Sequence, residues 1–136
     1  MTQKKVTVAA ALLFAALMGT LGVRAVTAQQ AAFKRTVLQR GDLVTPGREA
    51  VMAQAEIPAG VRVGRHTHPG EEVGYVMEGT LLLEVEGKPP VTLKAGDVFF
   101  VEAGRPHDGT NEGKATTKVL ATYIVEKGKP LASPAP

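Results

Sequence analysis

GVRVGRHTHPGEEVGYVMEG, residues 60–79, is the stretch of sequence that decides the fold of this chain. Two of the three histidines, His66 and His68, stand in it with one residue between them. In a β-strand this spacing places both imidazoles on the same face of the strand. The third histidine, His107, follows in the later segment GRPH, and we expect the fold to bring it back to the first two.

The segments on both sides of residues 60–79 alternate between apolar and polar residues, which is the period of a half-buried strand. Turn pairs such as Pro46-Gly47 and Pro69-Gly70 separate these segments. We expect about eight short strands, at residues 36–39, 50–57, 61–68, 72–78, 81–86, 91–93, 98–101 and 118–125. The strands near residues 36 and 120 are expected at sheet edges. With no helical pattern after residue 28, the sequence predicts an all-β fold, a sandwich or small barrel.

The length and composition of the chain are typical of one compact domain. It has 136 residues, of which 44% are hydrophobic, enough for a single core. Four Phe, two Tyr and no Trp indicate a core packed mainly from Val, Leu and Ile. The sequence contains no cysteine, which excludes disulfides, thiol catalysis and zinc-finger ligation.

The first 28 residues differ in composition from the rest. A basic start that includes Lys4 and Lys5 precedes an uncharged, largely apolar run over residues 6–23, and small residues follow at 26–28. This pattern predicts a secretory signal peptide that is cleaved before Gln29, and therefore an exported protein, periplasmic or secreted. The alternative is an uncleaved membrane anchor, because about eighteen apolar residues just span a bilayer.

Removal of that segment makes the chain formally neutral. The segment holds three of the sixteen basic residues and no acidic residue, so thirteen residues of each sign remain. The excess of basic residues therefore gives no reason to expect nucleic-acid binding. The remaining chain divides into a lead-in with an edge strand at 29–49, a β-barrel at 50–126 and a tail at 127–136. Three prolines and no periodic pattern predict that the tail is disordered.

The histidines and a nearby carboxylate form a candidate metal site. Strand parity places Glu72 on the inward face with Gly74 and leaves Glu71 as a rim charge. Three imidazoles and one carboxylate suit a divalent transition metal (Fe, Mn, Ni, Co, Cu or Zn) and leave positions open for water or substrate. Without a cation, desolvation of an inward Glu72 would raise its pKa. In one alternative, the histidines of His-Thr-His are a solvated or hydrogen-bonded pair on a loop. In another, His107 is a surface turn residue after Pro106.

Two motifs in this sequence resemble those of the cupin family. The first motif consists, at matching spacing, of Gly60, His66, His68, Glu72 and Gly79. The second motif consists of Gly96, Gly104, His107 and Asn111, with Glu102 where cupins usually have proline. The glycines of both motifs are expected to be turn residues with positive φ. The sequence resembles the small single-domain (type 2) cupins over about residues 50–125.

The resemblance implies a double-stranded β-helix, or jelly-roll barrel, with a divalent transition metal bound by His66, His68, Glu72 and His107. It also implies dioxygenase-like or related metal chemistry on a small organic molecule, and a homodimer. The alternative function is a non-enzymatic cupin that binds or senses a small ligand. A metal-free structural barrel is a third interpretation, because cupins share a fold more than a substrate.

The motifs do not fix any catalytic residue beyond the metal site. Candidates for acid/base chemistry, or for support of the metal ligands, are Glu102, Gln54, Tyr75, Met52, Arg62 and Arg105. Glu102 is notable because it replaces the family's proline, although a glutamate at a strand end is usually a solvated charge. The missing side chain at Gly74 either leaves room for a substrate or lets a neighbour pack closely.

Overall fold

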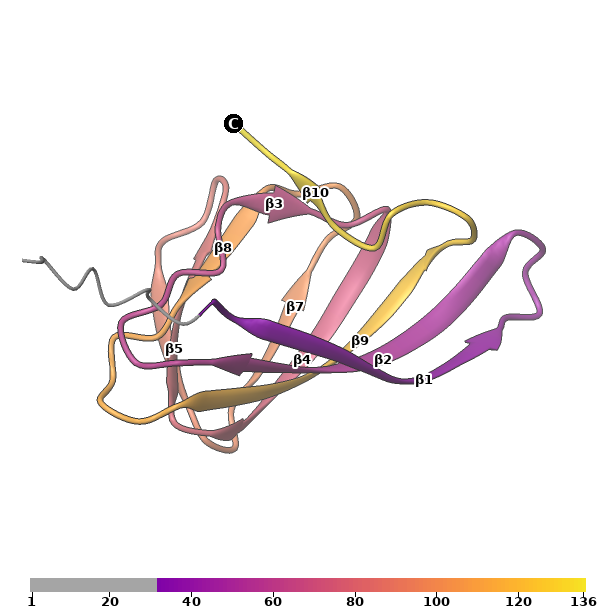
Figure 1. Ribbon diagram of the computed structural model, residues 1–136. Helices are drawn as coiled ribbons and strands as arrows, with labels where there is room; N and C mark the ends of the chain where they lie inside the picture. Colours follow the sequence, from indigo (N-terminus) through magenta and orange to yellow (C-terminus); the bar gives the residue numbers. More distant parts are fainter. Residues whose placement is uncertain (1–31) are drawn as a thin grey trace, which may run out of the picture.

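The computed structural model describes residues 32–136 and contains two five-stranded antiparallel sheets (Figure 1). The first sheet has the order β1-β2-β9-β4-β7, formed by Lys34–Asp42, Arg48–Ile57, Thr117–Glu126, Gly70–Glu78 and Val98–Val101. The second has the order β10-β3-β8-β5-β6, formed by Ser133–Pro134, His66–Thr67, His107–Thr110, Thr80–Val85 and Val91–Lys94. The prediction of an all-β fold built from two sheets is confirmed.

Strands, turns and loops make up the described part of the chain. Within residues 32–136, no helix is long and apolar enough to cross a membrane. The signal segment predicted at residues 1–28 lies outside the described residues.

The core lies between the two sheets and follows the alternation of the sequence. In β9, at the centre of the first sheet, Val119, Ala121, Tyr123 and Val125 are buried, whereas the residues between them are half-buried. The buried residues contributed by the second sheet are Leu81, Leu83, Val85 and Leu93. Burial of one such aliphatic side chain contributes about 1.5–3 kcal/mol relative to exposure. This packing stabilises a domain that has no disulfide.

The segment before the first two histidines is not the continuous strand predicted for residues 61–68. Gly64 has a φ of 99°, a conformation that other residues rarely adopt, and it interrupts the extended chain. Only His66–Thr67 forms a strand here, and a single bridge joins Arg62 to Thr110. The sequence does not predict β8 either, because residues 107–110 show no apolar alternation.

The edges of the first sheet are β1 and β7. The prediction of an edge strand near residue 36 is confirmed, although β1 is longer than the predicted residues 36–39. The prediction of an edge strand near residue 120 is wrong, because β9 lies between β2 and β4 inside the sheet. The motif glycines have φ values between 68° and 96°, as turn residues should, at Gly60, Gly79, Gly96 and Gly104.

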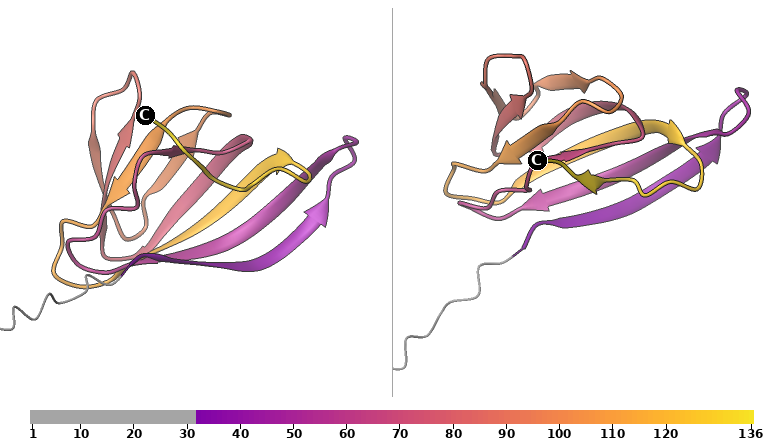
Figure 2. Two further views of the ribbon diagram at one scale, coloured as in Figure 1. Left: turned by 45° about the horizontal axis from the view of Figure 1, so that its top comes forward. Right: turned by 90° about the horizontal axis from the view of Figure 1, so that it is seen from above.

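The C-terminal tail, residues 127–136, is ordered, in contrast to the predicted disorder. It leaves β9 in the first sheet and crosses to the second, where β10 pairs with β3 (Figure 2). The Ala135 amide donates to the Arg65 carbonyl at 3.0 Å, and Leu131 packs against the buried cluster that includes Tyr123. Backbone hydrogen bonds and one apolar side chain hold this segment, and neither produces a periodic sequence pattern.

Candidate metal centre

The three histidines of the sequence lie side by side. His66 is on β3 and pairs with His107, the first residue of β8, and His68 directly follows β3. The centroids of the three rings are 4.3–5.0 Å apart, and one ligand atom of each ring lies within 4.8 Å of the others. The fold thus brings His107 back to the pair formed by His66 and His68.

Each imidazole is oriented by a hydrogen bond from its Nδ1 atom to a backbone carbonyl oxygen. The donor and acceptor pairs are His66 with Gly64 (2.6 Å), His68 with Leu131 (2.6 Å) and His107 with Arg105 (2.9 Å). A carbonyl oxygen only accepts, so Nδ1 carries the hydrogen in all three rings. Nε2 is therefore the nitrogen of each ring that could bind a cation, as in metal-binding histidines, and that of His107 also hydrogen-bonds Oε2 of Glu72 at 3.0 Å.

The surroundings of His68 test whether these residues fit a metal ion. Its Nε2 atom is buried and makes no hydrogen bond, although it lies 3.1 Å from an oxygen of Glu72. A buried polar atom without a partner costs about 1–3 kcal/mol, and a coordinated cation would remove that cost. Imidazole nitrogens beside a carboxylate suit Fe, Mn, Ni, Co, Cu or Zn. The residues therefore fit a divalent transition metal.

Glu72 is the carboxylate beside the histidines. It lies on β4 with a relative exposure of 6%, and its Oε2 atom is 3.0 Å from Nε2 of His107. The neighbouring Glu71 lies on the other face of β4, where it forms an ion pair with Arg48 at 2.6 Å. Strand parity therefore identifies the inward glutamate correctly.

The histidines keep the carboxyl group of Glu72 ionised. Burial alone would raise its pKa, but the hydrogen bond with His107 and the nearby ring of His68 outweigh burial and lower the pKa to about 2. The expected rise of this pKa without a cation is wrong, because the sequence does not show that two histidines face the carboxylate. Burial opposes the charged form of His107 too, yet the hydrogen bond with Glu72 raises its pKa. For His66, burial lowers the pKa to about 4, so the ring is neutral at neutral pH.

A small cavity of about 40 Å³ adjoins the histidines. His66, Glu72 and His107 form its polar side, and the rest of its wall is mainly aliphatic and aromatic. An outer recess of about 350 Å³ lies next to it, and residues 132–134 of the tail form part of the recess wall. The residues that line both spaces are Phe33, Arg35, Val63 and His66. An apolar pocket with a few converging polar groups is the usual form of a small-molecule site.

The sequence motifs do not reveal Phe33, Arg35 or Tyr123, which also line the cavity. Phe33 and Arg35 stand at the start of β1, before both motifs, and only their alternation with Lys34 could have placed them on one face. Burial raises the pKa of the Tyr123 hydroxyl, and the charge of Glu72 raises it further. The hydroxyl of Tyr123 therefore stays protonated at neutral pH.

None of the six candidates for acid/base or supporting roles lines the cavity. The side chain of Glu102 is 40% exposed and forms an ion pair with Lys88 at 2.6 Å. Gln54 lies on the strand face opposite the buried residues of β2, together with the exposed Met52. Tyr75 is exposed on the face of β4 opposite Glu72. These residues do not reach a ligand held by the histidines.

Asp108, which the sequence analysis does not single out, supports His66 through the turn at Gly64. Its buried carboxylate accepts hydrogen bonds from the Gly64 amide at 2.9 Å and from Nε of Arg62 at 2.5 Å. The carbonyl of the same glycine accepts the hydrogen bond from Nδ1 of His66. Arg62 therefore acts on Asp108 rather than on a ligand.

Gly74 lets a neighbouring ring pack against β4, which is one of its two predicted roles. A Cβ atom at this position would lie 2.1 Å from the ring of Phe99. The Phe99 ring lines the cavity. The glycine therefore sets the position of a cavity wall instead of leaving open space.

Two antiparallel sheets that enclose a pocket of three histidines and a carboxylate define a double-stranded β-helix barrel with a candidate metal centre. The sequence comparison identifies the family to which this barrel corresponds. Residues 53–123, more than half of the chain, match the family described as Cupin domain, and the chain belongs to this family.

Two relatives share part of the sequence. The chain is 37% identical over 76 residues to the oxalate-binding protein of Thermotoga maritima, covering 55% of this chain and 62% of that protein. It is 39% identical over 51 residues to the dimethylsulfoniopropionate lyase DddQ of Ruegeria pomeroyi, covering 38% of this chain and 25% of that protein. The chain thus spans less than two thirds of the length of either relative.

Solved structures with the same fold include DddQ and an oxalate oxidase. DddQ superposes with a TM-score of 0.65 at 23% identity, covering 76% of this chain and 52% of that chain. Oxalate oxidase in complex with glycolate superposes with a TM-score of 0.62 at 23% identity, covering 76% of this chain and 55% of that chain. At these identities the likeness shows the fold alone.

Proposed function

We propose that this protein is a metal-dependent cupin that acts on a small organic molecule at a site formed by His66, His68, Glu72 and His107. The observation that carries this proposal is the common orientation of the three imidazoles. Every Nδ1 atom is engaged by the backbone, so Nε2 is the nitrogen of each ring that could bind a metal, and at His107 the metal would replace the hydrogen bond of Nε2 with Glu72. One of these atoms, Nε2 of His68, is buried without a hydrogen-bond partner.

A divalent transition metal bound here supplies a Lewis acid or a redox centre, with one or two positions open to a ligand. The protein contributes the surroundings. The backbone hydrogen bonds hold the rings in place, the ionised Glu72 offsets part of the positive charge, and the apolar cavity wall excludes water. The Tyr123 hydroxyl lies beside Glu72 and Arg35, and its proton is directed to the carboxylate of Glu72.

The names of the relatives support a small organic ligand. One relative is named for binding oxalate, another for cleaving dimethylsulfoniopropionate, and the oxalate oxidase was solved with glycolate. Because each relative is matched only in part, the reaction itself is a proposal: dioxygenase-like or related metal chemistry.

The test is metal analysis followed by a substrate screen. Protein purified from the periplasm should hold close to one equivalent of a transition metal, and His66→Ala and His107→Ala should lose most of it. The metal-loaded protein is then screened with oxidisable, isomerisable and hydrolysable small molecules, with and without O2. Turnover by the loaded wild type that both variants lack supports the proposal. A wild type that holds no metal by elemental analysis contradicts it and favours a structural barrel.

The second candidate function is non-enzymatic binding or sensing of a small ligand. The oxalate-binding relative favours this function, as does the position of the six acid/base candidates outside the cavity. Metal-loaded protein that binds a small molecule in calorimetry but converts nothing in the screen would support binding over catalysis.

We also propose that the chain is exported, either to the periplasm or out of the cell. The support is the basic start, apolar run and small-residue exit of residues 1–28. N-terminal sequencing of the mature protein should give Gln29 as the first residue. Recovery of the uncleaved chain in the membrane fraction would instead favour an anchor.

A homodimer formed through the outer face of the first sheet is a further proposal. Val73 pairs with Phe100 and Tyr75 pairs with Val98 across β4 and β7, and all four side chains are 45–68% exposed. Monomeric proteins rarely expose large contiguous apolar patches. Light scattering should give a dimer for the wild type and a monomer for Val73→Glu. The control Val44→Glu, at a fully exposed turn position, should stay dimeric.

A further inference from the structure

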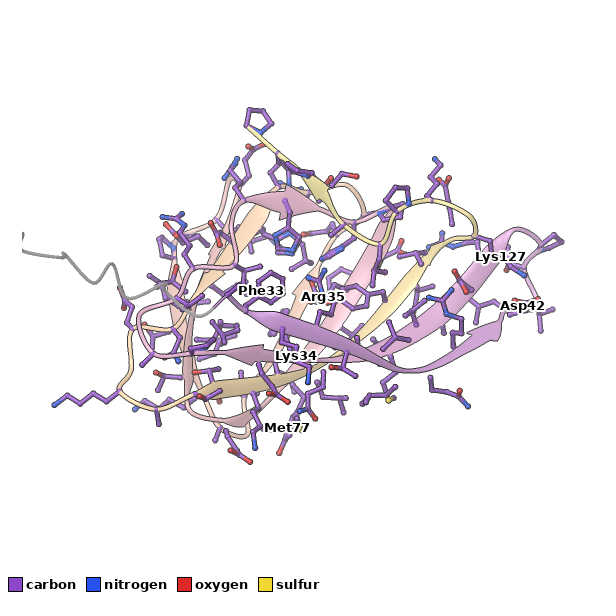
Figure 3. All side chains as sticks on the ribbon, viewed as in Figure 1. Phe33, Lys34, Arg35, Asp42, Met77 and Lys127 are labelled. Carbon is purple, nitrogen blue, oxygen red and sulfur yellow. The ribbon has the colours of Figure 1, made fainter. Side chains whose placement is uncertain are left out.

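A cationic side chain projects into the cavity beside the three histidines. Arg35 lies on β1, the edge strand of the first sheet, and lines both the inner cavity and the outer recess together with His66. Figure 3 shows Arg35 and Phe33 on one side of β1 and Lys34 on the other. The guanidinium carbon of Arg35 is 5.3 Å from the centroid of the Phe33 ring and 5.6 Å from that of Tyr123. The guanidinium is therefore held between two aromatic rings.

The Tyr123 side chain interacts with the guanidinium, but one N–H group of the arginine is left without an acceptor. The Nε atom of Arg35 is buried and has no hydrogen-bond partner. Among residues 32–136, no aspartate or glutamate forms an ion pair with Arg35, whereas Arg48 has one such partner and Arg62 has two. A buried N–H group without an acceptor costs about 1–3 kcal/mol. An oxygen acceptor supplied by a ligand would remove this cost.

The nearest buried carboxylate does not compensate Arg35, because it is already engaged. The carboxylate of Glu72 is hydrogen-bonded to His107 and lies 3.1 Å from His68. Its negative charge therefore interacts with the histidines and not with Arg35 through an ion pair. The aliphatic and aromatic wall of the cavity offers no other anion. The charged groups that a ligand in this space meets are thus the histidine site with Glu72 at one point and the guanidinium at another, with the neutral hydroxyl of Tyr123 beside them.

We propose that Arg35 anchors the carboxylate of a small anionic ligand whose other end reaches the three-histidine cluster. The planar fork of a guanidinium matches a carboxylate through two parallel hydrogen bonds. The inner cavity, of about 40 Å³, holds only a few water-sized atoms, so the part of the ligand that reaches from Arg35 to the histidines is short. This inference rests on the proposed function, since it names the chemical class of the molecule that the metal site handles.

The test compares a carboxylate probe with its neutral amide, glycolate with glycolamide, by calorimetry on the metal-loaded and the metal-free protein. Arg35→Gln should weaken glycolate binding about 10- to 100-fold, the amount that a charge-assisted hydrogen bond contributes. It should leave glycolamide binding and metal content unchanged. Arg35→Lys keeps the charge but loses the fork, and should bind glycolate with intermediate affinity.

Lys34→Gln is the matched control, because it removes the same charge one residue away on the opposite face of β1. Glycolate binding that is unchanged in Arg35→Gln, or equally weakened in Lys34→Gln, would overturn the anchor. Tighter binding of inorganic phosphate than of glycolate would overturn the assignment to a carboxylate. If the wild type binds glycolate through Arg35 but turns over no substrate, the enzymatic function fails while the anchor stands. If Arg35→Gln retains full binding and turnover, the anchor fails while the enzymatic function stands.

Discussion

The Nδ1 atom of His68 donates a hydrogen bond to the carbonyl oxygen of Leu131 at 2.6 Å. This contact links a side chain of the candidate metal centre to the C-terminal tail, 63 residues later in the sequence. The tail thereby sets which nitrogen of His68 carries the hydrogen and which is free for a metal. A segment with no periodic pattern of its own is thus part of the site.

Removal of residues 131–136 should weaken metal binding about 10- to 100-fold, the range observed when groups that support metal ligands are lost. The physical reason is that the His68 ring loses its acceptor and can rotate its Nε2 atom away from the cluster. Chelator competition measures the affinity. Leu131→Ala is the control, because it removes the apolar side chain but keeps the carbonyl. A truncated protein with wild-type affinity would show that the tail does not orient His68.

The clustering of the candidate metal ligands is predicted from sequence far better than the groups around them. His66, His68 and Glu72 lie within one short stretch, so their spacing keeps them close together, and strand parity within β4 selects Glu72 over Glu71. His107 is recognised only through the second motif, since its return depends on the pairing of β3 with β8.

The surrounding groups depend on tertiary contacts that leave no local signal. The acceptor for His68 is a backbone carbonyl at Leu131, and every residue has a carbonyl. Arg35 reaches the cavity because β1 pairs with β2 at the edge of the first sheet, a register that the motifs do not contain. The low pKa of Glu72 arises from two histidines on other segments. Sequence patterns therefore predict which residues could bind a metal. They do not predict the orientation of the histidine rings, the charge state of Glu72 or the position of Arg35 in the cavity.

Glu72→Gln should lower the metal affinity and reduce the thermal stability that metal loading provides, because a neutral amide is a weaker ligand. Glu71→Gln is a matched control one residue away, since its carboxylate pairs with Arg48 at the surface. It should retain wild-type metal content and change stability by less than about 1 kcal/mol. Elemental analysis and melting curves with and without metal provide the readout. Equal metal loss in both variants would contradict the inward assignment of Glu72.

The metal-free protein should lose stability as the pH falls from 6.5 to about 4. The pKa of His66 is 6.5 in the unfolded chain and about 4 in the fold, because burial disfavours the charged ring. The unfolded state therefore binds a proton that the folded state does not, and stability falls with pH. Glu72 continues the trend as the pH falls from 4.5 to about 2, because its pKa is lowered in the fold.

The contribution of His107 to stability changes with pH in the opposite direction to that of His66. Its pKa is raised in the fold, so its contribution is fully present below pH 6.5 and is lost as the pH rises through the raised value. Urea unfolding of the metal-free protein at several pH values distinguishes the contribution of His66 to stability from that of His107. His66→Gln should flatten the loss between pH 6.5 and 4. His107→Gln should instead remove the loss of stability that occurs as the pH rises above 6.5, and it should leave the profile between pH 6.5 and 4 unchanged. A wild-type midpoint that does not change over this range, together with an unchanged profile in His66→Gln, would contradict the assignment.

The loss of stability in three glycine-to-alanine variants should depend on how closely the new Cβ atom approaches neighbouring atoms. In Gly70→Ala the Cβ would lie 2.0 Å from the carbonyl oxygen of Ile124, on the neighbouring strand β9. Backbone cannot move there without breaking the pairing of β4 with β9, so the expected loss is about 3 kcal/mol or more. Gly74→Ala meets the Phe99 ring at 2.1 Å. A side chain can shift, so this loss should be smaller, about 1–3 kcal/mol.

Gly41→Ala completes the series as the control, since no atom lies within 4 Å of its added Cβ. Its stability in urea should stay within about 0.5 kcal/mol of the wild type. Because the Phe99 ring lines the cavity, Gly74→Ala should also alter ligand affinity, which Gly41→Ala should not. If Gly70→Ala were as stable as Gly41→Ala, β4 and β9 could not be paired in this register. The strand that carries Glu72 to the histidines would then be misplaced, and the site geometry with it.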